Sequence, residues 1–530
     1  MKRSHMGVAG AAALALVLTA ATADAATVSA ETFFATCNAP IFVLEDTIVT
    51  GKAEVATGCT VSVEPGIELE LQRAKLSFGG TFNVWGNGER VAVTNSKIVA
   101  SEIVIDARDL MVISGSKLQA TAGRINLPPR DNMTVELSTL EATGDVVLGG
   151  QGGARNVVSS KLIAGANINI AQGGIGYTGT QSSTAITDSQ LAAEGTITVG
   201  GFTSHTIVDS TFVSNFDTGN TSSRAIVLAS SGTSDGEIRR TSLTAPAGSI
   251  RIGANDFVSF EDVDIEAGAP GSTFYSDGAV SIAPDGTSAT GLRIQAELGS
   301  VHLGGFGAFS CTDCDIDAGG TNNENQAIRI GPFSNVTLVD GKLRARAGGM
   351  LIGGSSAVTL TDVKAQAEGA ANSGDGIVIG PNGTQNLTRV QLKVEDGRIK
   401  VTGGGAGSIT ESKIKDKSED GVLLTGSGGM TVTDSQVSSK AGNVTAPNGG
   451  GNTFDGNKIK SGGAEGFRVE SGSGATSVLE NQVKADNAFL RSFSGGTVAA
   501  GNQFSVDGVI EVSSSGSCLS VANDPDAPCN

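Results

Sequence analysis

Three aspartates in successive sequence repeats are the residues best placed to do chemistry. Asp375, Asp396 and Asp420 are each followed by glycine, and each precedes a short aliphatic segment. If these segments are strands stacked in register, neighbouring carboxylates lie about 5 Å apart. That separation suits paired acid–base catalysis or Ca²⁺ binding, and Arg398 and Lys400 lie close to the middle carboxylate. The competing interpretation is that Asp-Gly marks an ordinary turn.

The triplet Arg398-Ile399-Lys400 resembles the Arg-Ile-Lys motif of the polygalacturonase-like β-helix hydrolases, which use aspartates on adjacent coils. This resemblance implies that the three aspartates hydrolyse a polysaccharide. The chain departs from that family because it contains no Asn-Thr-Asp, Asp-Asp or Gly-His-Gly motif. A lyase would instead need a basic residue. A run of alternating charges could offer one, and its alternative role is to solvate an outer face: Lys413, Lys415, Asp416, Lys417 and Glu419.

Histidine and aromatic residues offer little further chemistry. Beyond the N-terminal segment the only histidines are His205 and His302, and we expect each at the surface or at a corner. No G-x-S-x-G, H-E-x-x-H, P-loop or EF-hand motif is present. Trp85 is expected to close the core near the N-terminal end, most phenylalanines, such as Phe257, to lie inside it, and Phe274-Tyr275 to form an exposed contact.

A repeated sequence pattern predicts which elements position these residues. It consists of a small polar residue, any residue, an aliphatic residue or Phe, any residue and a small residue, as in Ser116-Lys-Leu118-Gln-Ala120. The central residue, which we call the landmark, recurs from Leu76 to Phe504 about every 24 residues, and Val363 is one copy. Alanine often stands two places later, so both residues point to one side of a strand. Three short strands per repeat with glycine-rich corners predict a right-handed parallel β-helix of about 19 coils, roughly 90 Å long.

The position two residues before the landmark carries its own pattern. It is serine in the upstream repeats and becomes Asn457, Asn481 and Asn502 near the C-terminus. These asparagines resemble the asparagine ladder of the pectate-lyase-type β-helix, and we expect their amides to hydrogen-bond along the stack. Because asparagine and glycine tolerate the left-handed conformation, we expect them to form the left-handed corners of the coils.

The two ends of the array require caps. Residues 1–25 have the features of a secretory signal peptide, which leaves an N-terminal cap at 26–60, a β-helix at 61–514 and a C-terminal cap at 515–530. The segment Cys59–Ile67 resembles the entry coil of secreted β-helix proteins. Six cysteines form three local couples, although the sequence alone leaves their connectivity open: Cys37-Cys59, Cys311-Cys314 and Cys518-Cys529.

Every second coil in the middle of the chain is longer than its neighbours, which predicts loops on one side of the rod. Such loops are either binding elements or the result of drift after duplication of a two-coil unit. The candidate binding residues in these loops are Asp217, Asn220, Phe274, Tyr275, Asn323 and Asn325.

Composition limits the possible partners. The formal net charge of −18 disfavours nucleic acid and an anionic membrane surface as partners of the whole chain, and no later segment is long and apolar enough to span a membrane. We expect a secreted, cell-surface or periplasmic protein with a structural or adhesive role and no cofactor unless calcium binds, whose partners are polysaccharide or cell-envelope components. The alternatives are a polysaccharide-cleaving enzyme and a self-assembling extracellular fibre subunit.

Overall fold

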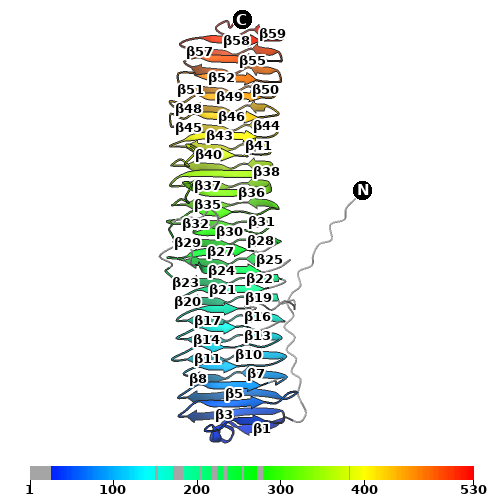
Figure 1. The fold of residues 1–530 in the computed structure, drawn as a ribbon, viewed down its shortest axis with the longest axis vertical. Helices are drawn as coiled ribbons and strands as arrows, with labels where there is room; N and C mark the ends of the chain where they lie inside the picture. The colour runs from blue at the N-terminus through cyan, green and yellow to red at the C-terminus, as the bar shows by residue number, and fades with distance from the viewer. Residues whose placement is uncertain are drawn as a thin grey trace, which may run out of the picture.

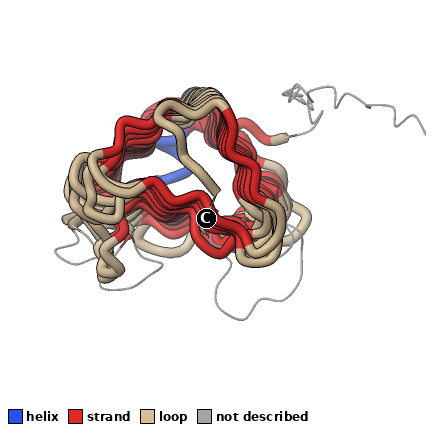
Figure 2. The backbone as a smooth tube through the Cα atoms, turned by 90° about the horizontal axis from the view of Figure 1, so that it is seen from above, coloured by secondary structure: helices blue, strands red, loops and turns tan. Residues whose placement is uncertain are grey.

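The computed structural model describes residues 25–86, 88–149, 153–170, 183–201, 204–217, 224–230, 235–253, 256–270, 278–380 and 382–529. These residues form a rod of stacked parallel strands with the first and last coils at opposite ends (Figure 1). Viewed along the rod axis, the coils superimpose as a three-sided outline with loops at the corners (Figure 2). The predicted fold class is confirmed, because the architecture is a right-handed parallel β-helix, here of about 21 turns.

Each coil contributes one short strand to each of three columns. In one coil these are β8 (Lys97–Ala100) in column A, β9 (Ile103–Ile105) in column B and β10 (Leu110–Ser114) in column C. Each strand pairs in parallel with the equivalent strands of the two neighbouring coils, as β8 does with β11 (Lys117–Ala120). The columns end at β57 (Gln503–Val506), β58 (Ile510–Ser514) and β59 (Cys518–Val521). In two coils, columns B and C merge into the long strands β36 (Gln326–Val339) and β38 (Gly349–Thr361).

The core is built from ladders of identical or similar side chains. Leu118, Leu140 and Leu162 are register partners in consecutive coils of column A, and all three are fully buried. The alanines two residues later form a second buried ladder. Because side chains alternate between the two faces of a strand, the residues between these ladders point outward.

The register corrects one landmark and extends the array. Ala365, rather than Val363, pairs with Leu343 and Leu392, so the landmark of that coil is alanine. Val363 lies at the preceding corner, where it is also fully buried. Ala53 pairs with Leu76, so one more coil precedes the first landmark. At the other end, Asp524 forms a β-bridge with Gln503, so the array also continues beyond the last landmark.

At the corner between columns C and A, the residue in the left-handed conformation is not the one predicted. The positive φ angle belongs to the residue that precedes the Ser or Asn, such as Glu480, with φ of 53°, before Asn481. The asparagines themselves are buried. Nor is glycine the usual residue there, since most of these corners hold charged or polar residues, among them Asp188, Asp209, Arg240, Asp262, Asp313, Asp340, Asp362, Arg389, Glu411 and Asp434.

A hydrogen-bond ladder stabilises this corner and compensates for the left-handed conformation, which costs about 1 kcal/mol or more per non-glycine residue. The Asn481 Oδ1 accepts hydrogen bonds from the Asn457 backbone N–H and Nδ2, at 2.9 and 3.0 Å, as the ladder prediction requires. Upstream, the Ser96 N–H donates to the Ser116 Oγ at 3.0 Å. Between these two polar stretches the same position is apolar, with Val263 and Leu292 among the residues that occupy it.

The ends of the rod are closed by local elements. At the N-terminal end, α1 (Ala30–Phe33) and the 3₁₀ turn η1 (Phe34–Thr36) place the Phe34 ring 5.3 Å from the ring of Phe78. Disulfides join all three predicted couples: Cys37-Cys59 at this end, Cys518-Cys529 at the other end, and Cys311-Cys314 across a corner in the middle.

Three predictions of side-chain burial are wrong. Trp85 is 63% exposed because it occupies an outward position of β6 (Phe82–Gly86), and Phe34 takes the closing role expected of it. Phe257 is 41% exposed because it also points outward, at the start of β28 (Phe257–Glu261). His205, expected at the surface or at a corner, is only 2% exposed because it occupies an inward position of β22 (Ser204–Val208).

Candidate functional site

The three candidate aspartates do not lie in one register. They lie at the starts of three consecutive strands of column B: β40 (Asp375–Ile379), of which Asp375 is the first residue, β43 (Arg398–Gly403) and β46 (Val422–Gly426). A bulge between Asp375 and Ile377 places Asp375 opposite Arg398, not opposite Asp396. The expected ladder of three stacked carboxylates is therefore wrong in register, because the Asp396 coil has one more residue between the aspartate and the isoleucine that pairs with Ile377.

The electrostatics of this corner follow from that register. Both Nε and Nη2 of Arg398 donate to the Asp375 Oδ1, at 2.9 and 2.7 Å, and Asp375 is only 4% exposed. Asp396 and Asp420 are exposed, and neither has a side-chain partner among the described residues. Within the described ranges, no group of three His, Cys, Asp or Glu side chains is arranged to hold a metal ion. The corner thus combines one neutralised carboxylate with two free ones.

Of the charged residues considered for a lyase, only the acidic Asp416 lies inside the coil, and the basic residues lie outside it. Asp416 is buried and accepts hydrogen bonds from the hydroxyls of Ser418 and Ser439, at 2.7 and 2.6 Å. It therefore fixes a turn and is not available to a substrate. The Lys417 Nζ lies 2.9 Å from Glu395, while Lys400 is half-buried on the outer side of β43. Lys413, Lys415 and Glu419 are exposed.

Two of the predicted loops lie in contact. The Asn372 Nδ2 donates to the Asn323 carbonyl at 2.9 Å, although a complete short coil separates these loops in the sequence. The carbonyl of Asn325 accepts from the Gly349 N–H at 2.7 Å, which ties the first loop to that short coil. Asp217 is exposed after β23 (Thr211–Ser214), and Asn220, Phe274 and Tyr275 lie outside the described residues.

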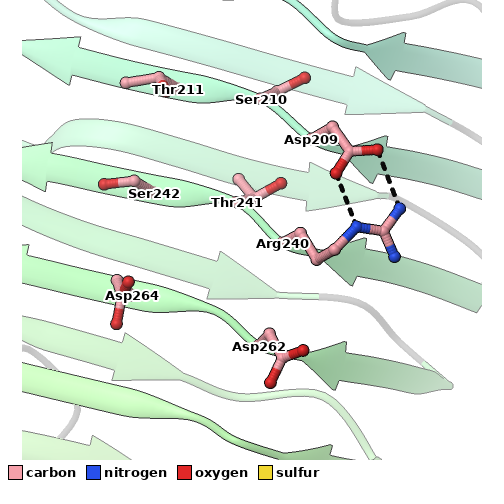
Figure 3. Close-up of a pocket in the computed structure, with 8 residues that line it drawn as sticks. All are labelled: Asp209, Ser210, Thr211, Arg240, Thr241, Ser242, Asp262 and Asp264. Carbon is pink, nitrogen blue, oxygen red and sulfur yellow. Dashed lines mark hydrogen bonds and ion pairs between the residues drawn. The ribbon is translucent and has the colours of Figure 1, made fainter.

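A shallow hollow of about 280 Å³ lies at the left-handed corner, a site that the sequence analysis missed (Figure 3). Arg240 donates two hydrogen bonds to the carboxylate of Asp209 in the preceding coil, Nε to Oδ1 at 2.6 Å and Nη2 to Oδ2 at 2.9 Å. This hydrogen bonding lowers the pKa of Asp209. Asp262 in the following coil and the outward Asp264 also line the hollow, together with the hydroxyl residues Ser210, Thr211, Thr241 and Ser242.

The same arrangement recurs further along the corner. Arg389 donates to both carboxylate oxygens of Asp362, at 2.7 and 2.6 Å, and Glu411 follows in the next coil. The repetition shows that the hollow belongs to a charged corner ridge rather than to a single convergent site. The signal that could have revealed it is the charged residue that repeatedly precedes the Ser or Asn of the repeat.

Comparison with known proteins identifies the fold. Residues 370–524 match the family described as the right handed beta helix region, which covers the C-terminal coils and all three candidate aspartates. No curated protein and no solved structure matches the chain. No helix in the described part of the chain is long and apolar enough to cross a membrane.

Proposed function

For this β-helix repeat protein, we propose a non-catalytic role as a secreted or cell-surface rod with a structural or adhesive function. The observation that carries the proposal is the pairing of Asp375 with Arg398. A catalytic carboxylate must exchange protons or contact a substrate, whereas Asp375 is buried and bound at one oxygen by two guanidinium N–H groups. Its position instead stabilises the entrance to β40.

The outer surface also favours a structural role. The hollow beside Asp209 and Arg240 belongs to a charged ridge that continues to Asp362 and Arg389, so its groups do not converge on one point as those of an active site do. Three disulfides, which are typical of proteins outside the cytoplasm, fix the two ends and one corner. A rigid rod of this kind presents binding surfaces at a defined distance from its ends.

The enzymatic alternative rests on Asp396 and Asp420, which are exposed on neighbouring coils. The test is depolymerisation of neutral and acidic polysaccharides by the purified protein, with and without Ca²⁺. Newly formed reducing ends report hydrolysis, and the absorbance of unsaturated uronates reports elimination. We expect no activity with any substrate from a sample whose β-structure is verified by circular dichroism.

Two triple variants make this test specific. The first replaces the candidates, as Asp375→Asn, Asp396→Asn and Asp420→Asn, and the second replaces three exposed corner aspartates, as Asp313→Asn, Asp340→Asn and Asp434→Asn. Wild-type activity that the first variant loses and the second retains would overturn the non-catalytic proposal and locate the active site. Sedimentation over a range of concentrations tests the third alternative, because a fibre subunit should form long assemblies and a rod should not.

A further inference from the structure

One outer face of the C-terminal half has a charge opposite to that of the whole chain. It consists of the outward side chains of seven consecutive column A strands, which we call the Lys face. These strands are β37 (Lys342–Ala345), β39 (Lys364–Ala367), β42 (Gln391–Val394), β45 (Lys413–Asp416), β48 (Gln436–Ser439), β51 (Lys458–Ser461) and β54 (Gln482–Ala485). Each strand contributes its first and third residues, since the second and fourth point into the core.

The Lys face contains no acidic residue. Of its fourteen outward positions nine are basic and the remaining five are glutamine or serine. The chain as a whole carries −18. Of the three column A strands immediately before it, β29 (Asp264–Ala267) and β35 (Asp315–Ala318) place only acidic residues at their outward positions, and β32 (Arg293–Ala296) places one arginine and one glutamine there. The positive charge is therefore concentrated on the C-terminal coils.

Most of these cations are not neutralised within the protein. Lys342, Arg344 and Lys393 form ion pairs with Asp315, Glu368 and Glu395. The other six are exposed, and the described part of the chain supplies no ion-pair partner for them: Lys364, Lys413, Lys415, Lys458, Lys460 and Lys484. Their positive charge is available to a partner.

The shape of the Lys face indicates what kind of partner fits it. Strands about 4.8 Å apart, with outward side chains about 7 Å apart along each strand, form a planar grid about 34 Å long and 13 Å wide. The six unpaired cations amount to roughly one per 75 Å², the same order as the area of a lipid headgroup. The first and third residues of the strands form two parallel rows of cations. A planar surface contacts both rows at once, whereas a single linear polymer that follows one row leaves the other unused.

Nearby acidic residues do not cancel this field. Acidic residues adjoin both edges of the face. The corner ridge carries Asp340, Asp362 and Glu411, of which Asp362 is neutralised by Arg389, and the opposite corner carries the free Asp396 and Asp420. Their side chains are shorter than lysine, whose ammonium extends further from the backbone. Charges on the other faces are screened, because the Debye length is about 8 Å at physiological ionic strength. A net charge that disfavours membrane binding by the whole chain therefore does not exclude it for this face.

We propose that the Lys face binds an anionic lipid surface, so that the rod lies along the membrane on its C-terminal half. This inference does not depend on whether the rod has catalytic activity. The contact requires no membrane-spanning segment, because each exposed lysine near an anionic bilayer contributes separately. Glutamine already occupies four of the fourteen positions, so the same strands tolerate uncharged replacements of similar length.

The test measures co-sedimentation of the intact protein with vesicles of phosphatidylglycerol and phosphatidylcholine, and with phosphatidylcholine alone. The Lys-face variant carries Lys413→Gln, Lys415→Gln, Lys458→Gln and Lys460→Gln. A control with the same change in net charge carries Lys52→Gln, Lys161→Gln, Lys400→Gln and Lys440→Gln, all outside the Lys face. We expect the wild type and the control to bind anionic vesicles in a salt-sensitive manner, and the Lys-face variant to bind at least about a hundredfold more weakly.

Four results would overturn the proposal. They are the absence of wild-type binding at low salt, equal loss in both variants, binding to neutral vesicles as strong as to anionic ones, and binding to a soluble acidic polysaccharide without binding to vesicles. Circular dichroism of both variants verifies that the replacements leave the fold intact.

Discussion

Acidification should destabilise the rod through one buried imidazole, that of His205. The ring points into the core from β22, between Thr184 of β19 (Ser183–Thr187) and Gly236 of β25 (Asp235–Arg239). Gly236 makes this possible, because a Cβ atom at that position would overlap the His205 Nε2. The described residues provide no hydrogen-bond partner for Nε2. A proton added to this ring would therefore place an uncompensated charge in the core.

The size of the effect follows from the pKa. Burial lowers the pKa of His205 from its ordinary 6.5 to about 4. In the unfolded chain the ring regains a pKa of about 6.5, so the unfolded state binds the proton first as the pH falls. Stability is unaffected above pH 6.5 and is lost progressively between pH 6.5 and 4. The full loss is about 3 kcal/mol, and at pH 4.5 about 2.5 kcal/mol of it has occurred.

Urea unfolding followed by circular dichroism at pH 7.5 and pH 4.5 measures this loss. His205→Thr is the informative variant, because threonine occupies the same register position in the preceding coil. We expect the wild type to lose about 2.5 kcal/mol more than this variant between the two pH values. His302→Gln, at the half-buried outward position of β33 (Val301–Leu303), serves as the control and should behave like the wild type. Equal pH dependence of His205→Thr and the wild type would refute the reasoning.

Three further perturbations test the ladder, the candidate site and the disulfides. Asn481→Ala leaves buried partners of the asparagine ladder without hydrogen bonds, so the free energy of unfolding measured in urea should fall by about 2–3 kcal/mol, and an unchanged value would contradict the ladder's role. Arg398→Met leaves the Asp375 carboxylate buried and unpaired and should lower stability by about 2 kcal/mol, with recovery when Asp375→Leu is added; no recovery would show that the pair has another role. Mild reductant should open Cys518-Cys529, which has an exposed cysteine, before the buried Cys311-Cys314, as measured by alkylation and mass spectrometry, and the reverse order would contradict the burial.

The sequence predicted the coil well because stacking constrains it repeatedly. Each inward residue faces an equivalent residue in the coil above and in the coil below, so a preference for aliphatic residues is expressed about twenty times. Where one coil departs from the pattern, its own sequence does not identify the landmark, and the register of the neighbouring coils is needed. At 361–365 the residues Thr361, Val363 and Ala365 fit the repeated pattern, which predicts valine as the landmark, while the neighbouring coils place Ala365 in that register.

The left-handed corner illustrates a second limit. Intrinsic preference assigns such a conformation to glycine or asparagine, yet Asp209, Arg240 and Asp362 adopt it here. Tertiary hydrogen bonds outweigh the local preference, because the backbone N–H of each of these residues donates to a carbonyl of the following coil: Asp209 to Arg239, Arg240 to Glu261 and Asp362 to Thr388. This leaves the side chain of the left-handed residue outside the core, where a charge is favourable. The charged ridge and its hollow are therefore consequences of this hydrogen bonding between coils, and a search for catalytic motifs does not detect them.

The candidate aspartates do not form one cluster, because their similar positions in the sequence do not correspond to the same position across the sheet. Asp-Gly precedes a strand in all three coils, but one additional residue before Ile399 shifts Arg398 into the position opposite Asp375. A displacement of one residue thus converts a pair of repelling carboxylates into an ion pair. Two free carboxylates, Asp396 and Asp420, remain at this corner, and for that reason activity on polysaccharides is tested by the loss of all three aspartates and not by Asp375 alone.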